Sequence, residues 1–191
     1  MSTLKTNTIQ AATGTTVSVA DGHTFAPPGH VIQVVQSTLT STASGTGTTI
    51  VDSGLTGTIT PSSTSSKIYV NGYITLGTSS FFVYCFLVRG STQIFKGDAA
   101  GDRPTPTVAN TQHMTGNDIY NFEAVPFQFL DSPNTTSATT YKIQIRHYTT
   151  GTWYVNRTHA DRDLSGHEPR GPSVITFCLL YTSDAADESV G

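Results

Sequence analysis

The segment from residue 159 to residue 168 gathers side chains that could take part in chemistry. It contains two histidines and three acids, which are His159, Asp161, Asp163, His167 and Glu168. Imidazole and carboxylate groups can ligate metal ions, but these lack the short, regular spacing of a metal site. Arginines are interleaved with them at positions 157, 162 and 170. Because charged side chains usually stay in solvent, the favoured interpretation is a self-neutralising loop without a metal, and a metal site is the alternative.

Two aromatic residues just before this loop suggest a second kind of chemistry. Aromatic rings stack on the C–H faces of sugars, while Asp, Asn and Arg side chains bond to the hydroxyl groups. The segment therefore predicts a glycan site, with Trp153, Tyr154, Arg157, His159, Asp161 and Asp163 as the ligand-binding residues. Packing of Trp153 in the core is the alternative, since tryptophan is highly buried on average.

Catalytic motifs do not occur in the sequence. It has no Gly-x-Ser-x-Gly, no His-Glu-x-x-His and no phosphate-binding loop with a lysine. Glycoside hydrolysis needs two carboxyl groups at a fixed separation, whereas the acids here are few and scattered. We therefore expect a protein that binds and assembles, that is not an enzyme and that needs no cofactor.

The composition is typical of an all-β protein. Charged residues make up only 12% of the 191 residues, and Thr, Ser and Gly, which favour strands and turns, take their place. The net charge is −3, and no cluster of Lys and Arg could neutralise a run of phosphates, so nucleic acid is not an expected partner. The longest apolar run, 81–88, is far shorter than the roughly 20 residues of a membrane helix, and no secretory signal is visible.

Alternating apolar and polar residues predict a series of short strands. The predicted strands are 30–37, 48–51, 58–60, 67–76, 80–89, 121–130, 141–148, 153–156 and 173–177. Short strands at this spacing favour an antiparallel β-sandwich or jelly roll. The expected core comprises Ile68, Val70, Ile74, Phe81, Val83, Leu87, Ile143 and Ile145. The connections 96–116 and 156–171 are long, and long loops on a β scaffold usually carry the binding residues.

The strand 81–88 is apolar on both faces. A sandwich core needs only one of them, so Phe82, Tyr84 and Phe86 on the second face require cover. Either a loop of the same chain covers these three rings, or they form a subunit interface, where aromatic residues are enriched. Both interpretations are open, and the second predicts a homotrimer.

The first 28 residues have too little apolar surface to fold alone. They nevertheless contain two short strand patterns, at 5–10 and 15–20, and end at the boundary Pro27-Pro28-Gly29. An arm of this kind can obtain its order from other chains, which predicts a short N-terminal β arm for trimerisation and attachment. A disordered tail is the alternative.

The C-terminal stretch 178–188 reads Cys-Leu-Leu-Tyr-Thr-Ser-Asp-Ala-Ala-Asp-Glu. It resembles one reading frame of a transposase adaptor used to prepare sequencing libraries. We therefore expect three parts, which are the arm at 1–28, a sandwich head domain at 29–177 and an adaptor-derived tail at 178–191 that packs poorly.

Three stretches resemble a known group of proteins. They are Ser2-Thr-Leu-Lys-Thr-Asn-Thr-Ile-Gln with Thr13-Gly-Thr-Thr-Val-Ser-Val, then Pro28-Gly-His-Val-Ile-Gln-Val-Val-Gln, and then Gly57-Thr-Ile-Thr-Pro-Ser-Ser-Thr-Ser-Ser-Lys-Ile. They look like tail-fibre-like and other virion proteins from bacteriophages of marine bacteria.

The resemblance implies a trimeric structural protein of the virion. Its arm would contact other virion proteins, and its head would bind a host-surface glycan or an outer-membrane receptor. Two alternatives are open, namely a cellular adhesin or carbohydrate-binding module, and a fibre-borne glycan depolymerase. The absence of a visible secretory signal argues against the adhesin, and the scattered acids argue against the depolymerase.

Overall fold

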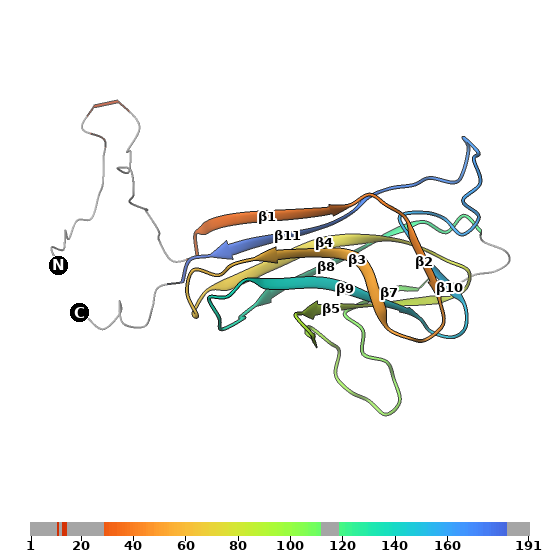
Figure 1. Ribbon diagram of the computed structural model, residues 1–191, viewed down its shortest axis with the longest axis horizontal. Coiled ribbons are helices and arrows are strands. Elements are labelled where there is room, and N and C mark those ends of the chain that lie inside the picture. The colour runs from red at the N-terminus through yellow and green to blue at the C-terminus, as the bar shows by residue number, and fades with distance from the viewer. Residues whose placement is uncertain (1–10, 12, 15–28, 112–118, 183–191) are drawn as a thin grey trace.

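The protein folds as a sandwich of two antiparallel β-sheets (Figure 1). The computed structural model describes residues 11, 13–14, 29–111 and 119–182. Every regular element in this part of the chain is a β-strand, so it holds no apolar helix that could cross a membrane. The all-β sandwich expected from the sequence is confirmed. The predictions for the arm and for residues 183–191 lie almost wholly outside the described residues.

The first sheet is built around β4 (Lys67–Thr78). β4 pairs along one side with β8 (Glu123–Asp131). Along its other side it pairs first with β11 (Ser173–Leu180) and then with β10 (Thr152–Val155). β1 (Val31–Leu39) adds to β11, and β2 (Ala43–Thr46) adds to β10. The sheet therefore has β1, β2 and β8 at its edges.

The second sheet is centred on β9 (Thr139–His147). β9 pairs with β3 (Val51–Ile59) on one side and with β5 (Phe82–Arg89) on the other. Beyond β5 lie two short strands, β6 (Thr92–Gln93) and β7 (Val108–Thr111). The strands β2, β6 and β7 were not predicted, because they are short and two of them consist of Thr, Gly, Ser, Ala and Gln without an apolar alternation.

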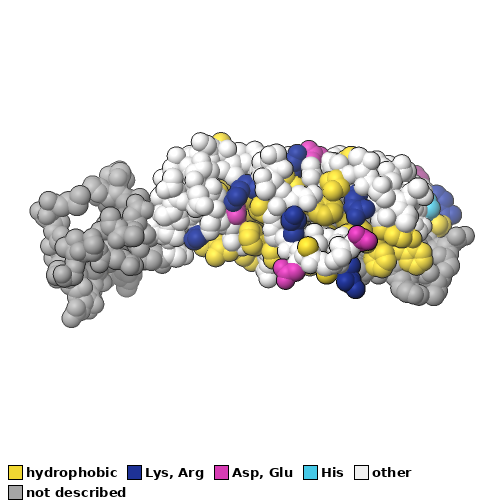
Figure 2. All heavy atoms as spheres, turned by 90° about the horizontal axis from the view of Figure 1, so that it is seen from below, with side chains coloured by type: hydrophobic (Ala, Val, Ile, Leu, Met, Phe, Trp, Pro, Cys, Tyr) yellow, Lys and Arg dark blue, Asp and Glu magenta, His cyan; other side chains and the backbone are white. Residues whose placement is uncertain are grey.

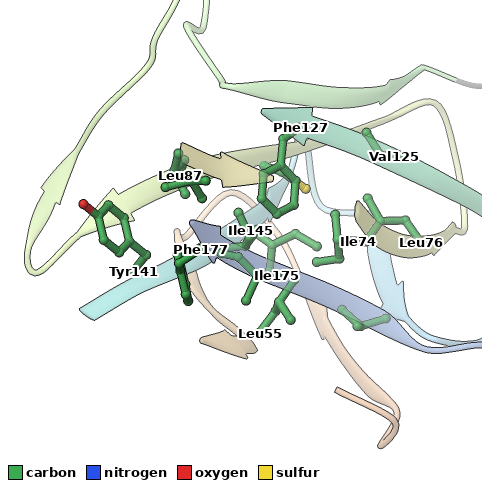
Figure 3. Packing of buried hydrophobic residues seen from close by; sticks show 14 of the residues in the cluster. Leu55, Ile74, Leu76, Leu87, Val125, Phe127, Tyr141, Ile145, Ile175 and Phe177 are labelled. Carbon is green, nitrogen blue, oxygen red and sulfur yellow. The ribbon is translucent and has the colours of Figure 1, made fainter. Parts of the chain in front are cut away.

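The core lies between the two sheets and follows the alternation of the long strands. Figure 3 shows side chains from β4, β5, β8, β9 and β11 meeting in one cluster. All the expected core residues are buried except Phe81, whose exposed fraction is 39%. Phe81 lies in the turn before β5 with a φ of 27°, so the strand alternation does not extend to it. The prediction that it belongs to the core is wrong.

The last strand runs further than expected. β11 continues through Leu180, and Leu179 is only 2% exposed within the core cluster. The inward alternation of Ile175 and Phe177 continues at Leu179, so the ladder with β1 and β4 extends with it. The expectation that the sandwich ends at residue 177, with poor packing from Cys178 on, is therefore wrong for these three residues. The adaptor origin of the stretch stays a prediction.

The sandwich has two distinct ends. Gly29 N–H donates to the Tyr181 carbonyl at 2.8 Å, and Val31 lies opposite Leu180, so the sandwich begins and ends at one place, the terminal end. From there β1 and β11 extend to Leu39 and Ser173. The loop 156–171 precedes Ser173 and extends toward the opposite, distal end (Figure 1).

Candidate functional site

The loop 156–171, called the tip loop below, is anchored to the sandwich by Tyr154. This ring is 7% exposed. His159 stacks on it with a centroid separation of 5.2 Å, and the Arg157 guanidinium lies 4.4 Å from its centroid. A guanidinium over an aromatic face is attracted by the ring quadrupole. Three of the predicted ligand residues therefore form one stack, and the faces of Tyr154 are largely used within it.

Asp161 joins the two ends of the tip loop. Arg170 donates to both of its carboxylate oxygens, each at 2.8 Å, and Arg157 Nη1 lies 3.5 Å away. The hydrogen bonds from Arg170 hold the pKa of Asp161 below its ordinary value. Asp161 itself has a φ of 47°, a left-handed backbone conformation that short polar residues tolerate better than most. The pairing supports the self-neutralising loop predicted from the sequence.

A second ion pair, between Arg162 and Glu168, closes the outer part of the tip loop, and Tyr120 links that part to the segment before β8. Arg162 donates to Glu168 from its backbone N–H and from Nε, the latter at 2.6 Å. Burial opposes the ionisation of Glu168, but the bonds from Arg162 prevail and lower its pKa. Arg162 also donates to the Tyr120 hydroxyl at 3.2 Å, and Tyr120 meets His167 edge to face.

A polar hollow of ≈ 660 Å³ lies on the tip loop. Its lining residues are Asp161, Arg162, Asp163, Leu164, Ser165, Glu168 and Arg170. It includes Asp161 and Asp163 of the predicted ligand set. Arg162 and Arg170 were expected only as neutralising charges, and Glu168 only as a member of the alternative metal site. No three His, Cys, Asp or Glu side chains of the described residues gather as metal ligands would.

Trp153 does not belong to this site. It is 5% exposed and lies in the core cluster, where its indole packs over Gly45. β10 alternates so that Trp153 turns into the space between the sheets, which leaves it without a free face for a sugar. The prediction that Trp153 binds ligand is wrong, and the alternative of core packing is confirmed.

A second feature of the distal end is a cluster of four rings, called the aromatic patch below and formed by Phe81, Phe82, Tyr84 and Tyr148. Tyr148 meets Phe81 and Phe82 edge to face, at centroid distances of 5.8 and 5.7 Å. Phe82 and Tyr84 lie 6.3 Å apart with their planes within 6°. Phe81 and Phe82 keep 39% and 37% of their surface exposed. Figure 2 shows hydrophobic side chains gathered near the distal end of this face.

The structure separates the three rings that were expected together at a subunit interface. Phe82 and Tyr84 lie in the aromatic patch, but Phe86 is 5% exposed within a single chain. Val88, two residues on, is 1% exposed and likewise lies outside the central cluster. Phe86 therefore needs no sister chain to cover it, and the expectation that this ring requires a subunit interface is wrong.

Buried His147 supports the turn that carries the patch. Thr149 N–H donates to His147 Nδ1 at 3.1 Å, so the ring proton is on Nε2. Nε2 then donates to the Ser80 carbonyl at 2.8 Å. Thr78 holds the same turn, because its hydroxyl donates to the Ser80 carbonyl at 2.6 Å. The residue just before Phe81 is thereby fixed from two strands.

Comparisons with known proteins give a faint structural likeness only. No family model matches the sequence, and no curated protein is similar to it. The structure of infectious bursal disease virus Gt strain has 14% sequence identity and a TM-score of 0.37, and covers 86% of this chain and 44% of that one. The structure of the Gx strain has 13% identity and a TM-score of 0.38, over 88% and 42% of the two chains. This chain thus spans less than half the length of those proteins.

Proposed function

We propose that the chain is a structural protein of a virion whose sandwich domain attaches the particle to the surface of its host, as in a tail fibre. The observation that carries this proposal is the separation of the two ends. The arm joins at the terminal end, where Gly29 bonds to Tyr181, while the tip loop and the aromatic patch lie toward the distal end. A protein that is held at one end and binds at the other has this arrangement. The three sequence stretches that resemble phage virion proteins also support it.

Assembly as a homotrimer is part of the proposal. The arm precedes β1, an edge strand on which Val31 and Val34 are 44% and 60% exposed. Exposed apolar residues beside an arm too small to fold alone favour association at the terminal end. Parallel copies would present their distal ends side by side, so weak binding sites on tethered copies would together bind with higher avidity. The arm would also bind other virion proteins.

The tip loop offers polar groups for the hydroxyls of a host glycan or for an outer-membrane receptor. The acids Asp161 and Glu168 are held by arginines rather than by each other. Glycosidases need a proton donor beside an ionised carboxylate, whereas these pairings lower both pKa values. We therefore propose binding without catalysis, and release of reducing sugar from a host polysaccharide would contradict this.

Adsorption to cells tests the proposal. The purified full chain, carrying a fluorescent label, is incubated with a panel of marine bacteria, and bound fluorescence is measured after washing. We expect binding to a restricted set of strains and competition by the polysaccharide extracted from those strains. Asp163→Asn changes an exposed acid of the hollow and should weaken binding, whereas Asp98→Asn, an exposed acid in the 96–107 loop, is the matched control. Absence of binding to every strain would contradict the proposed function.

A further inference from the structure

The aromatic patch is held in place before any ligand arrives. Tyr148 lies edge to face against both Phe81 and Phe82, and Phe82 stacks beside Tyr84. Its turn is fixed beneath by His147 and Thr78 through the Ser80 carbonyl. Because the rings are already ordered by one another, a ligand would lose little free energy in immobilising them.

The exposed area of the patch fits a small ligand better than a subunit. An aromatic side chain presents roughly 150–250 Å², so the exposed fractions of Phe81 and Phe82 leave about 150 Å² between them. A stable protein–protein interface buries about 800 Å² on each partner. Tyr84 and Tyr148 are half-buried and add less than Phe81 and Phe82 do. The patch alone therefore falls well short of that area, but it matches the face of one or two sugar rings.

Arg146 supplies a positive charge at the edge of the patch. It lies opposite Tyr84 in the β5–β9 ladder, with its guanidinium carbon 4.9 Å from the ring centroid. Arg89, Arg157, Arg162 and Arg170 all pair with carboxylates. Among the described residues, Arg146 has no acidic partner within 4.0 Å, and its Nη1 donates a long, 3.4 Å hydrogen bond to the His147 carbonyl. A guanidinium so placed can accept a bidentate anion.

We infer that the aromatic patch and Arg146 together form a binding site for an anionic hexopyranose, in which the rings stack on the C–H face of the sugar and Arg146 binds its carboxylate or sulfate group. This inference rests on the proposed attachment function and adds to it a class of ligand and a site outside the tip loop. The site takes acidic residues of a surface polysaccharide, and neutral sugars of the same size bind it less tightly.

Titration calorimetry on the full chain tests the site with three sets of probes of equal length. These are oligogalacturonates, sulfated galactan oligosaccharides and neutral galactan oligosaccharides, so that carboxylate and sulfate are distinguished. We expect one of the acidic probes to bind at least about tenfold more tightly than the neutral one, since a hydrogen bond to a charged group is worth that much. Added salt should weaken the binding of the acidic probe and leave the binding of the neutral probe unchanged.

Two substitutions distinguish the contribution of the Arg146 charge to binding from that of the aromatic rings. Arg146→Gln should bring the acidic probe to the affinity of the neutral one, whereas Phe82→Ala should weaken both. Arg103→Gln is the matched control, because Arg103 is an exposed arginine that also has no ion-pair partner in the described part of the chain. Circular dichroism verifies that each variant folds, and light scattering measures its mass.

The binding, mass and adsorption measurements can each refute the inferred site. Equal binding of acidic and neutral probes, or no binding of any probe, overturns it. A fall in mass on Phe82→Ala also overturns it, because the patch would then be a contact between copies. If labelled Arg146→Gln and Phe82→Ala adsorb to cells as well as the unaltered chain does, this site is refuted while the attachment function stands. If the unaltered chain adsorbs to no cells, the attachment function itself fails.

Discussion

The Tyr141 hydroxyl donates a 2.6 Å hydrogen bond to Asp131, a contact that joins the two sheets near the terminal end. Tyr141 is fully buried and Asp131 is 5% exposed. Arg89 of β5 donates to both Asp131 oxygens at 2.8 and 2.9 Å. A buried carboxylate is costly unless it is paired and hydrogen-bonded, so these two donors are what allows Asp131 to lie in the sandwich.

Tyr141→Phe should destabilise the protein at neutral pH. The substitution removes a buried bond to a charged acceptor, which is worth about 1.5–3 kcal/mol. Burial, followed by the bond to Asp131, raises the pKa of Tyr141 above its ordinary 10.0. Stability from the neutral phenol is therefore fully present below pH 10.0 and falls as the pH rises above that value. Urea unfolding of both proteins at pH 7 and pH 11 should show the difference shrinking at the higher pH, and a pH-independent difference would contradict the assignment.

Gly151→Ala should disturb the aromatic patch through His147. A Cβ at this position would lie 2.6 Å from His147 Nε2, the atom that holds the Ser80 carbonyl. Overpacking of this kind typically costs about 1–3 kcal/mol. Gly166→Ala is the matched control, because nothing lies within 4 Å of a Cβ there. Thermal melts of the two variants measure the contrast, and equal melting temperatures would show that the ring can move aside.

The ion pair of the tip loop should be sensitive to acid. Hydrogen bonds from Arg170 hold the pKa of Asp161 below 3.8. The stability that this pair contributes is therefore present above pH 3.8 and is lost as the pH falls through the lower, folded-state pKa. Asp161→Asn should melt at a lower temperature than the unaltered protein at pH 7, and the difference between the two melting temperatures should shrink as the pH falls below 3.8. A difference that does not shrink on acidification would mean that something other than the charge of Asp161 is lost.

The end of β11 should matter for stability. Leu179 is 2% exposed, whereas Leu180 is half-buried on the other face. Leu179→Ala should cost about 2–5 kcal/mol, as truncations in a packed core do, and Leu180→Ala should cost well under half of that. Guanidinium unfolding provides both values. Equal stability of a chain ending at Phe177 would instead show that the last residues of β11 are dispensable, as the adaptor resemblance suggests.

The alternation of apolar residues predicted the long strands but not their partners. Ile68, Val70, Ile143 and Ile145 were assigned to the core from their spacing alone, because a strand with one buried face has a period of two residues. Phe81 was misplaced because a turn interrupts that period just before β5. In the same way Leu179 was excluded by its resemblance to an adaptor, although it continues the inward alternation of its strand.

The candidate sites were harder to predict, because their residues come from distant parts of the chain. The tip loop is one segment, so its self-neutralising charges could be recognised from the sequence. The site formed by the aromatic patch and Arg146 combines Phe82 and Tyr84 of β5 with two residues more than 60 positions away, Arg146 and Tyr148. Only the β5–β9 register places Tyr84 opposite Arg146, and nothing in the local sequence sets that register.

The mass in solution tests whether the arm or the aromatic patch holds the subunits together. The full chain should have a mass near 61 kDa in solution, which is about three times 20.3 kDa. We expect deletion of residues 1–28 to lower the mass to that of one copy, because the arm cannot bury its apolar residues alone.

Phe82→Ala should leave the trimer intact, since the exposed part of the patch is too small to hold subunits together. Light scattering at micromolar concentration measures all three proteins. If the arm deletion stays trimeric and Phe82→Ala does not, the subunits associate through the outer face of the second sheet, at its distal end. The rings of the patch would then be covered by a sister chain and could not meet a sugar.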